Sequence, residues 1–340
     1  MRAWLRYFAI AAVLACGLLV AAGLHAWREL NEPLVLAADG EWLEIVPGTP
    51  LAAVARQLAT RGILDAPRIL TYYGRLSGDA TRIKAGEYLL TPTLTGRDLL
   101  NRIVDGQVFL HQLTVIEGWR FEDLRRALRA HSAVRPTDLE ADAIMAEIGA
   151  PGVHPEGQFA PDTYYFPRGT TDLLILRQAH DRMQSHLDTV WSERSPAAVV
   201  TTPYEALILA SIIEKETALA SERRQIAGVF SRRLERGMRL QTDPTVIYGL
   251  GEDFDGNLRR ADLGSDTPYN TYTRMGLPPT PIALPGIDSL MAAVDPAEGS
   301  ALYFVASGVP DGSHTFSDTL EEHNRAVAAS LRRLRSGSDQ

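Results

Sequence analysis

The stretch Thr202–Thr217, which reads T-P-Y-E-A-L-I-L-A-S-I-I-E-K-E-T, predicts the element on which the fold is built. Thr202, Pro203 and Glu205 form a helix start, with a hydroxyl cap, a proline in the first turn and a carboxylate three residues after the cap. From Ala206–Ile213 the helix is apolar all round except for one serine. A helix without a polar face is a buried helix. We therefore predict a central, buried helix here.

An acidic residue, Glu214, directly follows this apolar run. At about 100° per residue it shares a stripe with Leu207, Ala210 and Ser211, so we expect it to point into the protein or into a cleft. Burial raises the pKa of a carboxyl group, and the negative end of the helix dipole acts in the same direction. Glu214 is therefore a candidate general acid, unless it is a structural residue paired with an Arg or Lys. Glu216 lies about 200° away around the axis and is expected to face the opposite side.

Length and composition narrow the class of protein. The 340 residues leave room for about two domains, and the net charge of −8 argues against a nucleic-acid-binding protein, which needs a basic face. The single cysteine, Cys16, excludes a disulfide within the chain. The histidines are scattered, without His-Glu-x-x-His or another ligand spacing, so we expect no metal site.

The N-terminal segment is predicted to cross a membrane. Tyr7–Leu24 carries no charge and is long enough to span a bilayer, with Trp27 following as an interfacial aromatic residue. Arg2 and Arg6 precede the run, so the positive-inside rule places the N-terminus in the cytoplasm. We expect residues 1–30 to be a cytoplasmic N-terminus and a single-pass anchor in the cell (inner) membrane, with the rest periplasmic or otherwise extracytoplasmic. A cleaved signal peptide or a lipoprotein site at Cys16 are the alternatives, which the long apolar run disfavours.

The remainder of the chain predicts an α+β fold. After a linker at 31–40, strands and helices alternate, and later segments are mostly helical. The expected elements are strands at Glu41–Val46, Gly86–Leu90, Leu113–Ile116 and Ala301–Ala306, and helices at Leu51–Gly62, Asp98–Val104, Phe121–Arg129, Thr171–Trp191 and Ser221–Arg236, with His314–Ser317 capping a last helix that runs to about Leu334.

Residues 240–282 form a long polar and aromatic segment with few periodic apolar positions, and such segments are usually functional. Its side chains offer amides, hydroxyls and aromatic faces, which suit a sugar. The candidate substrate-binding neighbours of Glu214 are Gln241, Asp243, Tyr269, Asn270 and Tyr272. The alternative is that they only brace the loops. A Ser–Lys pair at Ser211 and Lys215 is disfavoured, because this serine lies inside an apolar helix.

Several blocks of the sequence resemble the signature blocks of the MltG/YceG-like endolytic murein transglycosylases. The blocks are Ala210–Thr217, Leu240–Val246, Pro268–Tyr272, Gly276–Ile282 and Glu322–Asn324, and Ile116–Trp119 and Glu156–Tyr164 also fit. They cover nearly the whole chain after the anchor and follow the family's order and spacing.

The resemblance implies a domain plan and a site. Residues 41–108 are similar to the family's LysM-like subdomain, a small α/β unit, and residues 109–335 to its larger mixed α+β catalytic domain, with 336–340 as a disordered tail. Glu214 matches the family's catalytic glutamate. Leu284 departs from the family pattern, which usually has Asn there, so position 284 is left out of the site.

The resemblance also implies an enzyme that cuts nascent peptidoglycan strands internally, between N-acetylmuramic acid and N-acetylglucosamine. Glu214 would protonate the leaving oxygen and then activate the muramyl C6 hydroxyl to close a 1,6-anhydro ring, without a metal, nucleotide or organic cofactor. Expected partners are the glycan strands, the membrane, and penicillin-binding proteins or other cell-wall synthases. The alternative is a non-catalytic glycan-binding scaffold that positions synthases, although such a protein has no use for a buried acid.

Overall fold

The computed structural model describes residues 2–337, and the chain divides into two compact units. Unit 1 comprises the chain up to His111 together with Tyr165–Gly169, and unit 2 comprises Gln112–Tyr164 and the chain from Thr170 onward. Each unit has its own hydrophobic core. Within the described residues the secondary structure is mixed α and β, with four two-stranded sheets, so the α+β class is confirmed.

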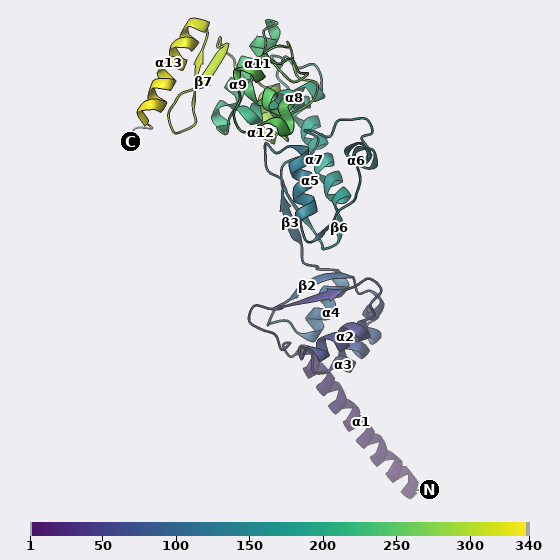
Figure 1. The fold of residues 1–340 in the computed structure, drawn as a ribbon. Helices are drawn as coiled ribbons and strands as arrows, with labels where there is room; N and C mark the ends of the chain where they lie inside the picture. Colours follow the sequence, from purple (N-terminus) through teal and green to yellow (C-terminus); the bar gives the residue numbers. More distant parts are fainter. Residues whose placement is uncertain (1, 338–340) are drawn as a thin grey trace. The chain divides into compact units, whose positions relative to one another are not determined.

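Unit 1 contains one two-stranded sheet and several helices (Figure 1). Its elements are α1 (Arg2–Asn31), β1 (Glu41–Ile45), α2 (Leu51–Thr60), α3 (Pro67–Leu76), the 3-10 helix η1 (Asp79–Thr81), β2 (Gly86–Leu90) and α4 (Gly96–Asp105). The strands β1 and β2 pair antiparallel, with Leu43 opposite Tyr88. Both side chains are fully buried and form part of the core.

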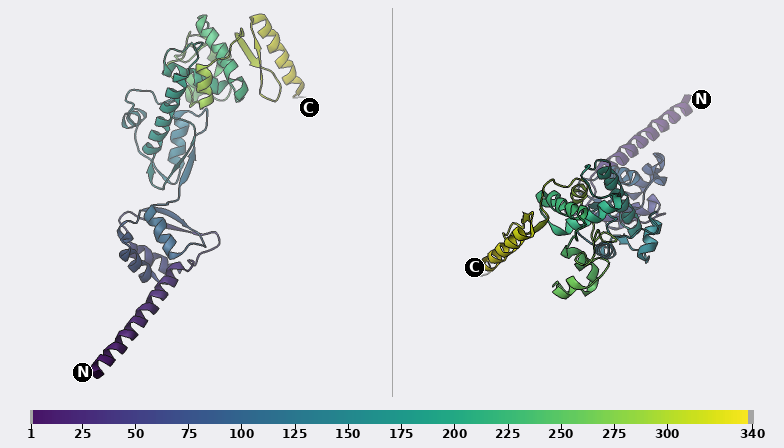
Figure 2. Two further views of the ribbon diagram at one scale, coloured as in Figure 1. Left: turned by 180° about the vertical axis from the view of Figure 1, so that it is seen from behind. Right: turned by 90° about the horizontal axis from the view of Figure 1, so that it is seen from above.

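The helix α1 is a single unbroken helix, apolar and long enough to cross a membrane (Figures 1 and 2). Its C-terminal end is docked on the rest of unit 1, because Leu30 and Leu34 are buried in the core of that unit. Leu34 N also donates a hydrogen bond to Leu94 O at 2.8 Å. The predicted linker at 31–40 is thus anchored on unit 1 through Leu34.

Unit 2 contains most of the helices. The elements from its start onward are β3 (His111–Thr114), α5 (Phe121–Ala130), β4 (Val134–Arg135), α6 (Ala141–Glu147), β5 (Thr163–Phe166), β6 (Thr170–Thr171), α7 (Asp172–Ser192), α8 (Pro203–Glu216), α9 (Ala220–Glu235), α10 (Asp243–Leu250), η2 (Gly251–Asp253), α11 (Arg260–Gly264), α12 (Ile287–Val294), β7 (Tyr303–Ala306), β8 (His314–Ser317) and α13 (Leu320–Gly337).

The central helix of unit 2 is α8, as the sequence predicts. Every residue of Ala206–Ile213 is buried, and α7, α9, α10 and α12 pack around the helix (Figure 1). Thr202 caps it by accepting a hydrogen bond from Glu205 N at 3.1 Å. The buried helix thus carries its last residues, which include both acids, to the edge of this core.

The C-terminal part of unit 2 pairs β7 antiparallel with β8, and α13 packs against both strands (Figure 2). The prediction that His314–Ser317 caps the last helix is wrong: these residues form β8. The cap is Thr319, whose hydroxyl accepts a hydrogen bond from Glu322 N at 3.2 Å. Residues 336 and 337 still belong to α13, so the predicted tail starts too early, and its residues 338–340 lie outside the described residues.

Candidate functional site

A pocket of about 500 Å³ lies in unit 2 where the end of α8 meets α9, the start of α10 and the β7–β8–α13 part. Its lining is mostly polar and aromatic. The lining residues are Glu216, Arg233, Leu240, Gln241, Asp243, Tyr272, Tyr303, Phe304, Val305, Ala306, His314, Leu320, His323 and Asn324. The pocket therefore combines an acid from the central helix with three of the five predicted substrate-binding residues.

Glu216, the last residue of α8, is the acid of this pocket. It accepts a hydrogen bond from Thr242 Oγ1 and stays partly exposed. Burial raises the pKa of Glu216 to about 7, and the charge of Asp243 acts in the same direction, whereas the Thr242 hydrogen bond and His314 oppose the shift. Near neutral pH this carboxyl group is present in both forms, so it can donate a proton and take one back.

Asp243 and Tyr272 face the same pocket and are joined to each other. Tyr272 OH donates a hydrogen bond to Asp243 Oδ1 at 2.6 Å. Burial raises the pKa of Tyr272, so its hydroxyl group keeps its proton and remains a donor. The pair gives the pocket a carboxylate whose orientation is fixed.

Gln241 is the only non-glycine residue with a positive φ in the described part of the chain, at 53°. This left-handed conformation is uncommon for glutamine and typically occurs where function requires it. Arg233 holds the segment in place: its Nη1 donates to Leu240 O at 2.8 Å, and its Nε donates to Leu302 O at 2.6 Å. One arginine of α9 thus joins two walls of the pocket.

The β7–β8–α13 part supplies residues that the sequence prediction missed. His314 Nδ1 lies 2.7 Å from Glu222 Oε2, which fixes the imidazole ring at the pocket wall. His323 stacks on Tyr303 with ring centroids 5.3 Å apart, and burial together with the charge of Arg233 lowers its pKa, so the ring stays neutral. The only sequence signal for this wall is the Glu322–Asn324 block.

Glu214 has a different environment. Its carboxylate accepts hydrogen bonds from Gly286 N at 2.9 Å and Ser289 Oγ at 2.7 Å, and lies 3.5 Å from Arg223 Nη2. Its side chain is only 6% exposed, and it is not among the residues that line the pocket. The side chain of Glu214 is thus largely covered, and it faces α12 and α9 rather than the predicted substrate-binding residues.

Two of the predicted substrate-binding residues, Asn270 and Tyr269, make contacts inside the fold and do not line the pocket. Asn270 is fully buried, donates to the carbonyl oxygens of the 262–265 segment, and accepts a hydrogen bond from Tyr272 N at 2.8 Å. Tyr269 packs on Tyr248 with ring centroids 4.9 Å apart, and its hydroxyl lies 2.9 Å from Thr280 Oγ1. Neither residue lines the pocket, so Asn270 contributes by holding Tyr272 in place.

A second acid, Glu156, has a pKa that burial raises to about 7. It is 4% exposed and accepts hydrogen bonds from Phe121 N at 3.0 Å and Tyr248 OH at 3.2 Å. Because it lies outside the pocket and is enclosed, its geometry is that of a structural group. Ser211 is also structural, since its hydroxyl donates to Ile208 O at 2.7 Å and accepts from Ile282 N at 3.0 Å.

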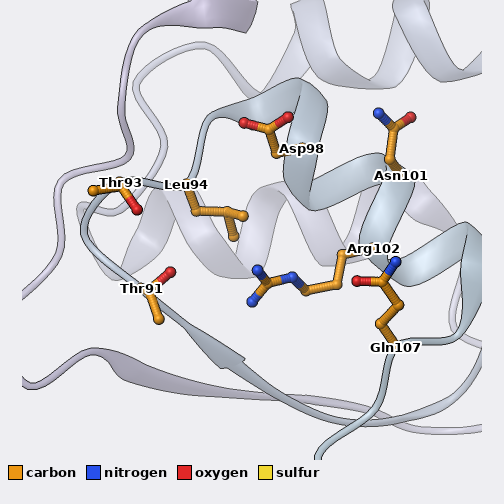
Figure 3. Close-up of a pocket in the computed structure, with 7 residues that line it drawn as sticks. All are labelled: Thr91, Thr93, Leu94, Asp98, Asn101, Arg102 and Gln107. Carbon is orange, nitrogen blue, oxygen red and sulfur yellow. The ribbon is translucent and has the colours of Figure 1, made fainter.

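Unit 1 has a pocket of its own, of about 380 Å³, between α4 and the turn that follows β2 (Figure 3). Figure 3 shows Arg102 reaching from α4 toward Thr91. Two of its polar groups are already engaged, because Asp98 caps α4 with Thr95 and Arg102 Nη1 donates to Leu89 O at 2.9 Å. This pocket offers hydrogen-bonding groups, but no acid with a raised pKa.

Among the residues that the structure describes, no group of three or more His, Cys, Asp or Glu side chains is arranged to hold a metal ion. The lining of the unit 2 pocket offers the carboxyl groups of Glu216 and Asp243 for acid–base chemistry, together with hydrogen-bonding groups and aromatic surface.

The fold and the pocket define a class: an α+β protein with an apolar N-terminal helix and an acid at the end of a buried central helix. The model of the YceG-like family matches residues 43–329, and the chain belongs to this family.

The curated relatives of this chain described below share the same name. A Bacillus subtilis protein named endolytic murein transglycosylase is 31% identical over 304 residues, covering 84% of this chain and 83% of the relative. A Streptococcus pneumoniae protein of the same name is 26% identical, covering 94% of this chain and 64% of that longer relative.

A solved structure has the same fold. The crystal structure of a yceG-like protein from Listeria monocytogenes matches with a TM-score of 0.54 and 28% sequence identity, covering 85% of this chain and 99% of that one.

Proposed function

We propose that this protein is an endolytic peptidoglycan lytic transglycosylase that cleaves the bond between N-acetylmuramic acid and N-acetylglucosamine and leaves 1,6-anhydro-muramic acid ends. The names of the curated relatives support the reaction class. The observation that carries the mechanism is a carboxyl group with a pKa of about 7 in an open pocket lined by hydroxyl, amide, imidazole and aromatic groups.

We assign the role of general acid to Glu216, in place of Glu214. Glu216 faces the pocket together with Gln241, Asp243 and Tyr272, whereas the oxygens of Glu214 are held by Gly286, Ser289 and Arg223. A general acid must reach the atom that it protonates, and Glu214 is enclosed on the opposite side of α8.

In the proposed reaction, Glu216 transfers its proton to the glycosidic oxygen as the bond from muramyl C1 to that oxygen breaks. The resulting carboxylate then takes the proton of the muramyl C6 hydroxyl as O6 bonds to C1. Glu216 ends the cycle protonated, and no water is consumed. Because the attacking hydroxyl is already part of the substrate, proximity replaces a captured water molecule.

The neighbours of Glu216 have supporting roles in this proposal. The carboxylate of Asp243, held by Tyr272, favours the protonated form of Glu216 and can stabilise positive charge that develops at C1. The amide of Gln241 and the rings of Tyr303 and His323 offer hydrogen bonds and flat surface for sugar units. No metal, nucleotide or organic cofactor takes part.

The apolar helix α1 supports a proposal for the location of the protein. We propose that it anchors the protein in the cell membrane with the N-terminus in the cytoplasm, so that unit 2 meets nascent glycan strands outside. We further propose that unit 1 is a LysM-like accessory module, which its small α/β make-up supports. Penicillin-binding proteins or other cell-wall synthases are the proposed partners that supply these strands.

The test is to incubate the purified full-length protein and its Glu216→Gln and Glu214→Gln variants with glycan strands, and to measure product masses. Internal cleavage that needs Glu216 supports the proposal. The competing proposal, a non-catalytic scaffold, requires binding without any cleavage by the unmodified protein. The raised pKa of Glu216 favours the enzyme, since a binder gains nothing from a carboxyl group poised near neutrality.

A further inference from the structure

One face of α3 in unit 1 is exposed and carries an unusual combination of side chains. Tyr72 is 61% exposed and Leu76 is 88% exposed, and Arg68 and Arg75 lie on the same face. At about 100° per residue, these four side chains occupy an arc of roughly 100°. The opposite side of α3 is packed, with Leu70 and Gly74 buried.

This face is basic although the whole chain has a net charge of −8. The helix α3 contains no acidic residue, and within the described residues neither Arg68 nor Arg75 has a carboxylate partner. A stripe of arginines mixed with an aromatic and an aliphatic side chain is the composition of helices that lie at a membrane surface, where the apolar groups enter the headgroup layer and the cations meet anionic lipids.

The helix α3 packs against α1, and Leu70 of α3 shares a core with Leu30, so this face belongs to an element that adjoins the C-terminal end of the anchor. The exposed Trp27 marks the interfacial end of the apolar run, and Ala26 and Glu29, on either side of it in the sequence, are already partly covered by unit 1. Leu30, one turn further along, is in the core. One helical turn is about 5.4 Å, which is no more than the headgroup layer on one side of a bilayer.

We propose that the α3 face formed by Arg68, Tyr72, Arg75 and Leu76 contacts the headgroups of anionic lipids, so that unit 1 is held against the bilayer as well as tethered to it. This inference rests on the proposed membrane anchoring by α1. It is independent of the chemistry in unit 2.

The experiment uses the full-length protein in nanodiscs of phosphatidylethanolamine and phosphatidylglycerol that contain a lipid carrying a quencher near its headgroup. In a Cys16→Ser background, a fluorophore is attached at Leu76→Cys, at Val46→Cys or at Leu18→Cys. Val46 is 58% exposed and follows β1, which, unlike α3 and α4, does not pack extensively against α1, so it is the matched control. Leu18 lies mid-way along the apolar run and, with a deep quencher, reports insertion of α1.

We expect strong quenching at residue 76 and little at residue 46. Arg75→Glu changes the charge by two units and should lower the docking equilibrium constant by roughly 25-fold, because one basic residue near an anionic surface is worth about fivefold. Arg56→Glu, at another exposed arginine of unit 1, should leave it unchanged. Quenching should also fall in discs of neutral lipid.

Four results would overturn the proposal. Quenching at 18 without quenching at 76 would show an anchored protein whose α3 face does not reach the lipid. Equal quenching at 46 and 76 would show that no particular face is preferred. Shielding of residue 76 only after a cell-wall synthase is added would assign this face to a protein. If residue 18 itself is not quenched, the anchor fails and the docking fails with it, whatever the cleavage assay shows.

Discussion

The hydroxyl of Thr242 donates a hydrogen bond to the carboxylate of Glu216 and accepts none from α10, the helix that Thr242 precedes. Thr242 occupies the N-cap position of α10, where a threonine side chain usually accepts a bond from the first turn, and no such bond is made. A residue placed to stabilise a helix is thus committed to the acid of the pocket. The bond favours the ionised form of Glu216 and limits the rise of its pKa.

Removing this hydroxyl should therefore shift the pH profile of cleavage. In Thr242→Val the charged form of Glu216 loses its donor, so its pKa rises above about 7. A general acid works while protonated, and the decline of kcat at high pH should move to higher pH. Thr245→Val is the control, because that buried hydroxyl bonds Thr242 O and Thr271 and does not touch Glu216. An unmoved high-pH limb in Thr242→Val would argue that Glu216 is not the acid.

Replacing Glu216 should reduce cleavage and leave the fold intact, whereas replacing Glu214 should lower stability and leave most of the cleavage activity. Glu216→Gln keeps its shape but cannot deliver a proton, so cleavage should fall by about 10²–10⁴-fold or more while the fold persists. Glu214→Gln should retain most cleavage but lower the melting temperature, because Arg223 loses a charged partner in a buried position and a broken buried contact costs about 1–3 kcal/mol.

The two readouts, strand cleavage and melting temperature, must be taken on the same preparations. Comparable loss of cleavage in both variants, with both folded, would return Glu214 to the list of candidate acids. Full activity in Glu216→Gln would remove Glu216 from it.

The raised pKa of the partly buried Glu216 carboxyl group should also make stability depend on pH. Its pKa is raised from 4.5 to about 7, so the favourable contribution of its protonated form is complete below pH 4.5 and is lost as pH rises through 7. Glu216→Gln has no charge to bury. Compared with the unmodified protein, the variant should be equally stable at pH 4 and more stable at pH 8, by at most roughly 3 kcal/mol. Calorimetric melting of both proteins at the two pH values measures this, and a variant that is less stable at pH 8 would contradict it.

The sequence predicts the central helix well but not which of its acids faces the pocket. Glu214 and Glu216 both follow apolar residues on their own sides of α8, because Ala206–Ile213 is buried on every side. Helical spacing therefore shows that the two acids lie on opposite sides of α8. It does not show on which of these sides the pocket lies. That depends on the loop around Gln241 and on the distant β7–β8 pair.

The same limit applies to the loop residues. Asn270 and Tyr272 are equally polar in sequence, yet Asn270 is enclosed by backbone carbonyls whereas Tyr272 reaches the pocket. His314–Ser317 is a further case, since its short polar pattern suits a helix cap until its pairing with β7 is known. Local patterns predict elements, but contacts between remote segments decide which side chains meet.

The topology of the chain is a separate prediction. The charges that flank the apolar run predict that the N-terminus lies in the cytoplasm and that residues from about 30 onward lie outside. A reporter enzyme fused to the C-terminus, active only outside the cytoplasm, should be active, and the purified protein should retain its N-terminal segment. A reporter active only in the cytoplasm would reverse the orientation, and a mature chain that begins after residue 20 would remove the anchor.

The last prediction concerns how the cut is completed. A glycosidase that uses water generally needs a second carboxylate, about 5–5.5 Å from the acid as a nucleophile or about 6.5–9.5 Å away as a base. Asp243 is the other carboxylate among the lining residues of the pocket, and it is held by Tyr272. If the muramyl C6 hydroxyl attacks instead, digestion in ¹⁸O-water should leave no label at the new muramic acid end, and the products should be lighter by one water than hydrolysis products. Label at that end would identify a hydrolase and make Asp243 its second carboxylate. Asp243→Asn should then abolish the labelled products, whereas in the transglycosylase it should leave the anhydro ends intact and lower the pKa of Glu216, moving the high-pH limb of kcat to lower pH.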